Sequence, residues 1–274
     1  MAAPDSSKQA GEGDFPYWLV ALILIGAAIA ALILASGLYS QVFRTVVTGL
    51  GITVMVTLIG FLLATALGLV IALLGLSDYK ALRQFSRFYI ELIRGIPVLV
   101  LLFYIAFVGA PGFVYAWNYL ASPLIEQGVI DPLLVREVSL MWRAIIALTI
   151  AYSAFIAEVF RAGIQSVDKG QVEAAKALGL SRFQRFRFVI FPQGLRVIFP
   201  PLSNDFVAMV KDSSLVSVLG VADITQMGKI YAAGSFRFFE TYSIVAYIYL
   251  VLTIGLSLAL RQVEKRMRQA PVKA

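Results

Sequence analysis

The sequence contains no cysteine and no histidine, and it has few charged side chains. These absences exclude disulfides, thiolate or imidazole metal ligands, a cysteine nucleophile and a histidine general base. Asp, Glu, Lys and Arg make up only 14% of the 274 residues, against roughly 25% in soluble domains. Hydrophobic residues make up 60%, and the mean hydropathy is +0.85. The composition therefore predicts an integral membrane protein.

Long charge-free stretches divide the chain into candidate membrane helices. A bilayer core about 30 Å thick needs roughly 20 helical residues at 1.5 Å each. Four charge-free stretches approach or exceed that length, at residues 18–35, 45–77, 95–125 and 241–260. A fifth helix is predicted at residues 140–160, where Arg143 and Glu158 flank an apolar centre and reach the interfaces by snorkelling.

A sixth helix is predicted at residues 198–221, although it carries Asp205, Lys211 and Asp212 inside an apolar stretch. The predicted fold is all-α and integral to the membrane, with about six transmembrane helices. Residues 1–16 are predicted as a cytoplasmic N-terminal tail and residues 262–274 as a basic cytoplasmic tail.

The first helix, at residues 17–38, allows a second interpretation. Its end, Ala35-Ser36-Gly37, resembles the small-residue cleavage site of a secretory signal. However, acidic residues such as Glu12 and Asp14 precede it where a signal would have a basic cluster, and the run is long for a signal core. An uncleaved N-terminal helix is the favoured prediction.

The distribution of Lys and Arg predicts the orientation of the helices. Residues 161–199 contain seven, residues 77–94 contain four and residues 261–274 contain five. By contrast, the segment 110–141 contains one and the segment 222–240 contains two. Because positive loops stay in the cytoplasm, the first three segments are predicted to be cytoplasmic, with both termini inside.

The longest basic segment carries the start and stop signals of two short helices. Asp168 and Gln171 have the spacing of a capping box, and Gly179 suits a left-handed C-terminal cap, so a helix is predicted from Lys169 to Leu178. Ser181 with Gln184 repeats the start signal, and Pro192 limits the second helix.

The second of these helices has an amphipathic pattern. Phe183, Phe186 and Ile190 share one face, and Arg182 and Arg185 lie on another. By itself this pattern predicts no more than a connector at the inner membrane surface, with its arginines facing anionic lipid.

A specific pattern runs through the whole loop. Glu173-Ala174-Ala175 is followed after three residues by Gly179 and after nine more by Val189-Ile190-Phe191-Pro192. This pattern resembles the Glu-Ala-Ala loop of the permease subunits of ATP-binding-cassette (ABC) importers, which usually ends in Ile-x-Leu-Pro. The conservative replacements by Val and Phe keep the apolar bulk and the proline.

The resemblance covers residues 45–261, as a type I ABC transmembrane domain, and narrows to the polar amino-acid uptake branch of that family. It rests there on Glu91-Leu-Ile-Arg-Gly-Ile-Pro97, Glu158-Val-Phe-Arg-Ala-Gly-Ile-Gln165, Pro192-Gln-Gly-Leu-Arg196 and Lys211-Asp-Ser-Ser-Leu215. The family core has five membrane helices, so the helix at residues 17–38 would be an additional one.

The resemblance implies a bacterial inner-membrane permease that imports amino acids, of polar or charged type, by alternating access. It also implies several partners: a dimeric cytoplasmic ATPase that binds ATP and Mg, a second permease subunit, an external or periplasmic solute-binding protein, and membrane lipid. In such a complex the first loop helix would dock in a cleft of the ATPase, with Glu173 pairing with a basic group. This chain itself would hold no cofactor or metal.

The charged residues of the sixth helix suggest a translocation path. At 1.5 Å per residue, Lys211 and Asp212 lie roughly 20 Å beyond Ile198, where an unpaired charge costs about 2.5 to 3.5 kcal/mol. One hypothesis is that the helix lines a path for a zwitterionic amino acid. The other is that its charges form a buried structural ion pair that fixes helix packing or the interface with a second permease. The candidate path residues are Asn204, Asp205, Lys211, Asp212, Ser213 and Ser214.

Two further pairs have the spacing of helical ion pairs. Glu91 with Arg94 and Glu158 with Arg161 lie three residues apart, and structural salt bridges are predicted for both. On the opposite side of the membrane, residues 110–141 are predicted as an external excursion with at most short interfacial helices. Residues 223–240 are predicted as a second external contact surface.

Other functional classes explain less of the sequence. A secondary transporter or channel fits six membrane helices but leaves the capped Glu-Ala-Ala loop without a role. An intramembrane enzyme lacks a recognisable catalytic pair, and a purely structural assembly subunit stays open. No Gly-x-x-x-x-Gly-Lys-Ser/Thr sequence is present, so ATP hydrolysis is expected to come from a partner. The net charge of +7 lies in the membrane-flanking loops, and no nucleic-acid partner is expected.

Overall fold

The computed structural model describes residues 17–269, and all regular elements in this range are helices. The predicted tail at 1–16 and the end of the predicted basic tail, 270–274, lie outside the described residues. In chain order the longer helices are α1 (Tyr17–Ala35), α2 (Gly37–Val47), α3 (Leu50–Gly75), α4 (Lys80–Arg94), α5 (Val98–Tyr104), α6 (Ala110–Leu120), α8 (Leu140–Gln165), α9 (Lys169–Ala177), α11 (Phe191–Asp212), α12 (Ile224–Ser235) and α13 (Phe238–Gln269).

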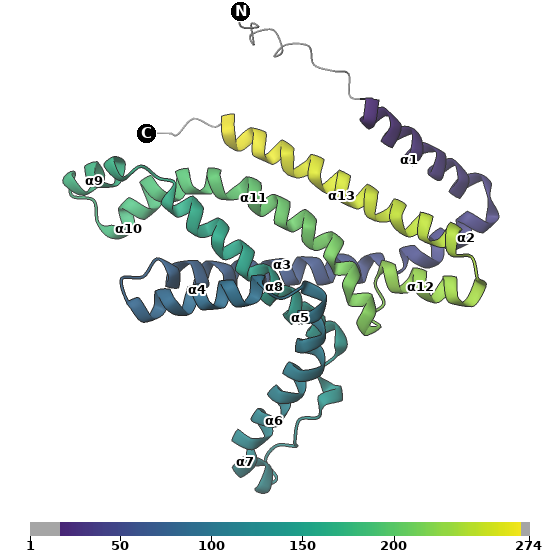
Figure 1. The fold of residues 1–274 in the computed structure, drawn as a ribbon, viewed down its shortest axis with the longest axis horizontal. Helices are drawn as coiled ribbons and strands as arrows, with labels where there is room; N and C mark the ends of the chain where they lie inside the picture. Colours follow the sequence, from purple (N-terminus) through teal and green to yellow (C-terminus); the bar gives the residue numbers. More distant parts are fainter. Residues whose placement is uncertain (1–16, 270–274) are drawn as a thin grey trace, which may run out of the picture.

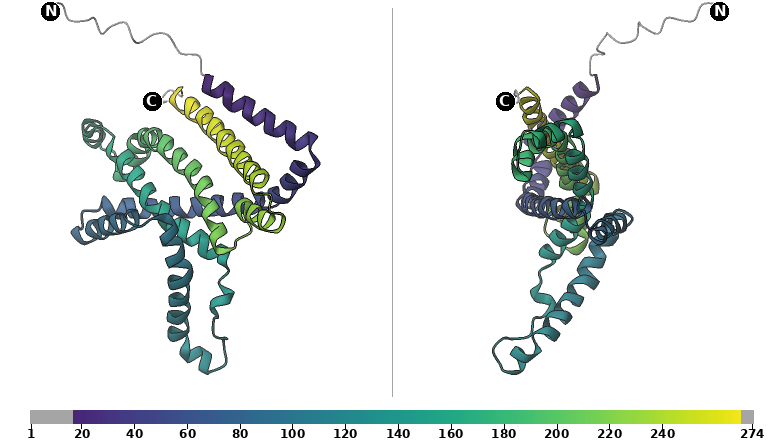
Figure 2. Two further views of the ribbon diagram at one scale, coloured as in Figure 1. Left: turned by 45° about the vertical axis from the view of Figure 1, so that its right-hand side comes forward. Right: turned by 90° about the vertical axis from the view of Figure 1, so that its left-hand side faces the viewer.

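Helices α3 and α8 form the centre of the bundle, with the most extensive contact between any two elements. Helix α11 packs on α8, and α13 packs on α11 (Figure 1). Helix α4 returns antiparallel along α3, so the segment predicted as a cytoplasmic loop at 77–94 is largely a helix. From the end of α4, α5 first packs against α8, and the chain then continues into α6, which projects away from the other helices; α5 and α6 together form an arm (Figures 1 and 2).

Within residues 17–269, four helical segments have the length and apolarity to cross a membrane: Gly37–Gly75, Val98–Leu120, Leu140–Gln165 and Phe238–Met267. The first of the predicted helices is present as α1, in which Val20–Ala35 forms a shorter apolar helix. The sixth, predicted at residues 198–221, is present as the second part of α11 followed by a 3-10 helix, η5 (Ser213–Leu219), and the charged and polar residues of α11 make it less apolar than these four segments. The all-helical membrane fold is therefore confirmed, while the number of six spans stays a prediction.

Glycine permits the close contact between α3 and α8. A Cβ atom added to Gly68 would lie 2.9 Å from the Ser153 carbonyl oxygen and 2.9 Å from Ile156 Cγ2. Lipid tails are as apolar as these side chains, so close packing rather than the hydrophobic effect has to hold such helices together. Along the same helix pair, Ile156 is fully buried at this contact, and Ile145 and Leu148 are fully buried beside Gly60.

Two prolines each lie two residues after a wide π-helical turn. The turn η2 (Ile105–Gly109) is followed by Ala110-Pro111, and the turn η4 (Phe186–Ile190) is followed by Phe191-Pro192. Proline has no N–H, and its ring collides with the carbonyl four residues earlier, which the wider turn relieves. The helices therefore continue through both prolines.

This continuity corrects two predictions. Pro192 does not end the second loop helix, because α10 (Arg182–Arg185), η4 and α11 follow one another without a break. Residues 110–120 are not part of an external excursion, because α6 continues the helix that begins at Val98. The excursion starts only at α7 (Ser122–Glu126) and returns through residues 127–139.

The first π turn leaves a carbonyl for Arg143. The Ala110 N–H donates to Ile105 instead of Ala106, and Pro111 has no N–H to offer. Arg143 Nη1 donates to the Ala106 carbonyl at 3.0 Å, and its other nitrogens donate to the carbonyls of Val138 and Val135. Arg143 is only 7% exposed, so the prediction that it snorkels to an interface is wrong.

Replacing Arg143 by leucine is expected to destabilise the arm. It would leave three carbonyls without their donor, and each unsatisfied buried group costs about 1–3 kcal/mol. We expect the Tm in detergent to fall by more than 5 °C, measured by intrinsic fluorescence. Arg136→Leu, which changes an exposed arginine of the same segment, is the matched control and should leave the Tm within about 1 °C. Equal Tm values for the two variants would show that the three hydrogen bonds of Arg143 do not stabilise the arm.

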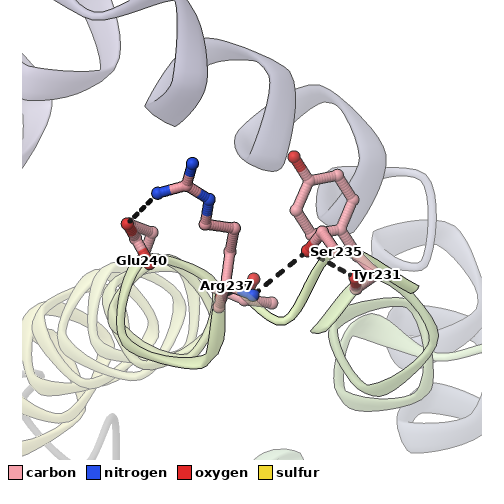
Figure 3. Close-up of polar contacts among 5 residues, drawn as sticks. Tyr231, Ser235, Arg237 and Glu240 are labelled. Atoms are coloured by element: carbon pink, nitrogen blue, oxygen red, sulfur yellow. Dashed lines mark hydrogen bonds and ion pairs between the residues drawn. The ribbon is translucent and has the colours of Figure 1, made fainter. Parts of the chain in front are cut away.

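A tight turn joins α12 to α13 (Figure 3). Phe236 has a left-handed backbone with φ 59°. Ser235 Oγ donates to the Tyr231 carbonyl at 2.7 Å and accepts from the Arg237 N–H at 3.3 Å. Arg237 also lies 3.5 Å from Glu240 Oε1. The predicted contact surface at residues 223–240 is thus an ordered helix and turn.

Candidate coupling loop and translocation helix

The first loop helix is capped as the sequence predicts. Asp168 Oδ1 accepts from the Gln171 N–H at 3.2 Å at the start of α9. The helix ends before Gly179, whose φ of +79° is the left-handed conformation that glycine adopts without steric cost. The Leu180 N–H closes the end by donating to the Ala175 carbonyl at 3.1 Å.

The Glu-Ala-Ala sequence divides between two faces of α9. Glu173 and Ala174 are exposed, whereas Ala175 is 5% exposed and packs inward. Leu178, at the end of the helix, is 80% exposed, which sequence reasoning missed because it was counted as an ordinary helix residue. The outward face therefore presents an acid, a small side chain and an apolar tip, which suits docking into a protein cleft.

The second start signal is also present. Ser181 Oγ accepts from the Gln184 N–H at 3.3 Å, and Gln184 Oε1 accepts from the Ser181 N–H at 2.8 Å, which completes a capping box. Of the apolar face, Phe186 and Ile190 line a cavity of about 110 Å³ together with residues of α3, α8 and α11. Phe183 is 70% exposed.

Helix α11 begins at Phe191 rather than at Ile198, so Lys211 lies about 30 Å along it at 1.5 Å per residue. Lys211 and Asp212 are thus at the end of the helix farthest from the coupling loop. The structure keeps two faces apart. Asn204 and Lys211 are exposed, while Asp205 and Asp212 are partly buried.

The two aspartates of α11 have different surroundings. Tyr152 of α8 donates its hydroxyl hydrogen to Asp212 Oδ2 at 2.7 Å. Asp205 Oδ2 is buried without a hydrogen-bond partner in the described part of the chain. Neither carboxylate forms an ion pair with Lys211 among residues 17–269, so an ion pair within the helix packing of this chain is not formed, while one at the interface with a second permease stays a prediction.

The two candidate serines also differ. Ser213 is fully buried and donates to the Val210 carbonyl at 2.7 Å, so its hydroxyl is not on an accessible surface of this structure, and its place on the path stays a prediction. Ser214 is partly exposed. Beside this helix, α3, α11 and α13 enclose a cavity of about 270 Å³ with an almost entirely apolar lining, including Thr57, Phe206 and Leu252. A charged ligand would not be stable in this cavity.

The two predicted ion pairs have different outcomes. Arg161 Nη2 lies 2.7 Å from Glu158 Oε2, so this pair is formed. Glu91 and Arg94 form none. Instead the Arg94 guanidinium lies over the ring of Phe155, 5.5 Å from its centroid, and links the end of α4 to α8.

Comparison with known proteins decides the family. The family model described as "Binding-protein-dependent transport system inner membrane component" matches residues 64–269, which include the coupling loop and α11. The chain belongs to this family. It is therefore a multi-pass membrane permease of the ABC importer type, as the Glu-Ala-Ala loop predicts.

Two curated relatives of this permease are bacterial. It is 36% identical over 228 residues to the probable amino-acid permease protein YxeN of Bacillus subtilis, covering 82% of this chain and 92% of the relative. It is 39% identical over 181 residues to the glutamine transport system permease protein GlnP of Escherichia coli, covering 66% of this chain and 73% of the relative.

The solved structures agree with this family. The crystal structure of an amino acid ABC transporter with histidines has a TM-score of 0.67 and 36% identity, covering 85% of the permease and 98% of that chain. The MetNI methionine ABC transporter in an inward-facing conformation has a TM-score of 0.61 at 18% identity, covering 82% and 96%. The second likeness shows the shared fold alone.

Proposed function

We propose that the permease imports amino acids with energy from a separate cytoplasmic ATPase dimer, which binds the ATP and Mg. The observation that carries the coupling is α9, a capped helix that presents Glu173, Ala174 and Leu178 outward between two membrane helices. A carboxylate on such a face favours a basic cleft, where its charge-assisted hydrogen bond is worth more than a neutral one. The permease itself would perform no ATP hydrolysis.

The amino-acid assignment rests on the relatives and on α11. Curated relatives are named amino-acid and glutamine permeases, and the more similar of the two solved structures above is titled as an amino acid transporter. Helix α11 offers a cation at Lys211 and carboxylates at Asp205 and Asp212, separated on neighbouring faces. Groups of both signs match the two charged ends of a zwitterion.

We infer that a second permease subunit, identical or homologous, packs against the projecting arm. Its apolar residues are strongly exposed, with Tyr104 at 59%, Phe107 at 58% and Phe113 at 58%. The arm is also the segment that leaves the bundle in both views of Figure 2. An exposed apolar surface of this kind suits a helix partner or membrane lipid.

We also propose that both termini and the coupling loop lie in the cytoplasm and that an external or periplasmic solute-binding protein docks on the opposite side. The Lys and Arg bias supports the orientation. At that opposite end, residues 121–139 and α12 provide the surface for the binding protein. Glu158 and Arg161, next to the loop, are proposed as a structural ion pair.

Uptake by proteoliposomes tests this function. The complex, purified through a tag on this chain after co-expression with its ATPase and binding protein, is reconstituted with Mg-ATP on the ATPase side. We expect accumulation of at least one radiolabelled L-amino acid, tested singly from glutamine, glutamate, arginine and histidine. Accumulation should require ATP. Gradient-driven uptake without any ATPase would instead establish a secondary transporter.

A further inference from the structure

The coupling loop is attached to α11 by an amide pair that the family pattern does not assign. Gln193, in the first turn of α11, donates from Nε2 to Gln171 Oε1 of α9 at 2.6 Å. The same nitrogen donates to the Val189 carbonyl in the π turn at 3.0 Å. A carbonyl can only accept, so this contact fixes which way the Gln193 amide points.

The partner glutamine is itself held at the start of α9. The Gln171 N–H donates to Asp168 Oδ1, which is the first half of the predicted capping box. Its side chain does not complete the box but accepts from Gln193 instead. One hydrogen bond thus joins the start of the coupling helix to the start of α11, and a local hydrogen bond on each side holds its two glutamines in place.

The base of the loop is a direct backbone contact. A Cβ atom on Gly163 of α8 would lie 2.2 Å from Ile198 Cγ1 and 3.2 Å from the Gly194 carbonyl oxygen. A Cβ atom on Gly194 would lie 3.1 Å from the Gly163 carbonyl oxygen. No side chain separates the two helices here, so α8 and α11 are packed too closely to slide independently at the loop.

We propose that Gln171 and Gln193 form a strut that passes displacement of the coupling helix to α11, the helix that carries the candidate path. Without this hydrogen bond, a motion of α9 would reach α11 only through the Gly179 turn at residues 178–181 and the continuous helix that follows it. With the strut, force enters α11 at its first turn, and the Gly163–Gly194 contact turns it into motion of α8 and α11 together. Both glutamines are positioning residues, and this inference rests on the proposed function.

Gln193→Leu tests the strut, because leucine keeps most of the volume but donates to neither acceptor. Amino-acid uptake and ATP hydrolysis are measured in the same proteoliposomes of the full complex. The labelled substrate is L-glutamine, or whichever of glutamate, arginine and histidine the wild-type complex takes up faster. We expect the number of amino acids carried per ATP to fall at least five-fold. The amount of ATPase that co-purifies with the permease should stay at the wild-type level.

Two more variants keep the test specific. Gln171→Glu retains an acceptor for Gln193 and should keep at least half of the wild-type ratio, whereas Gln171→Leu should match Gln193→Leu. The double leucine variant should be no worse than either single one, because both remove the same hydrogen bond.

Two results would overturn the strut. One is an unchanged transport-to-hydrolysis ratio in Gln193→Leu. The other is a loss of ATPase co-purification that accounts for the whole decrease, which would make the pair part of loop folding only. If wild type shows no ATP-dependent uptake, the proposed function fails rather than the strut, so the two failures are distinguishable.

Discussion

Glu173→Arg is expected to abolish ATP-driven uptake. Glu173 is exposed on the outward face of α9, and in the proposed complex it meets a basic group of the ATPase. Reversing its sign places like charges together, which costs several kcal/mol at an interface, and each 1.4 kcal/mol is ten-fold in affinity. At limiting ATPase we expect uptake and ATPase co-purification both to fall at least ten-fold. The two quantities are measured by proteoliposome transport and by quantitative immunoblot.

Glu126→Arg is the matched control for this reversal. Glu126 is also exposed, but it lies at the end of α7, on the predicted external side. The same chemical change there should leave ATPase co-purification at the wild-type level. Glu173→Gln should give an intermediate loss, because the amide keeps the size without the charge. Wild-type co-purification and uptake by Glu173→Arg would show that α9 is not the ATPase contact.

Local signals in the loop could be predicted from the sequence because each depends on a few neighbouring residues. Asp168 and Ser181 begin their helices by accepting from the N–H groups of residues three positions later. Gly179 ends α9 by adopting the left-handed backbone of a C-terminal cap, which depends only on the residues beside it. The predicted boundaries of α9 were therefore right to within one residue.

Errors arose where a tertiary contact overrides a local rule. The spacing of Glu91 and Arg94 predicted an ion pair, but Phe155 of α8 supplies a ring that no local pattern shows. Pro192 reads as a helix stop in sequence, whereas the π turn before it lets the helix continue. Pro111 and Pro192 share one feature: each lies two residues after a π turn, so a proline inside a predicted helix can mark a π turn rather than the helix end.

Arg143 shows the same difficulty for charged residues in membrane helices. Its position near the end of an apolar stretch suggested snorkelling. Its actual partners are backbone carbonyls, including the one freed at Ala106 by the π turn, and they come from the preceding arm and return segment. Predicting these hydrogen bonds would have required knowing that α5 and the π turn after it pack beside α8.

The second large effect is expected at Lys211, at the far end of α11. Its side chain is exposed and forms no ion pair with Asp205 or Asp212 in the described part of the chain. Its charge is therefore available to the carboxylate of a substrate, and a hydrogen bond to a charged group is worth about 1.5–3 kcal/mol. Lys211→Met should raise the KM for the transported amino acid at least ten-fold, measured from initial uptake rates at saturating ATP.

The structure supplies the control for this substitution. Lys211→Arg keeps the positive charge and should change the KM less than three-fold.

Asp212→Asn leaves an oxygen that still accepts from the Tyr152 hydroxyl, so its Tm should stay near that of wild type. Tyr152→Phe removes that hydrogen bond and should lower the Tm without changing which amino acid is carried. If Lys211→Met assembles normally and transports with unchanged affinity and specificity, Lys211 does not contact the substrate, and α11 contributes to transport through its motion alone.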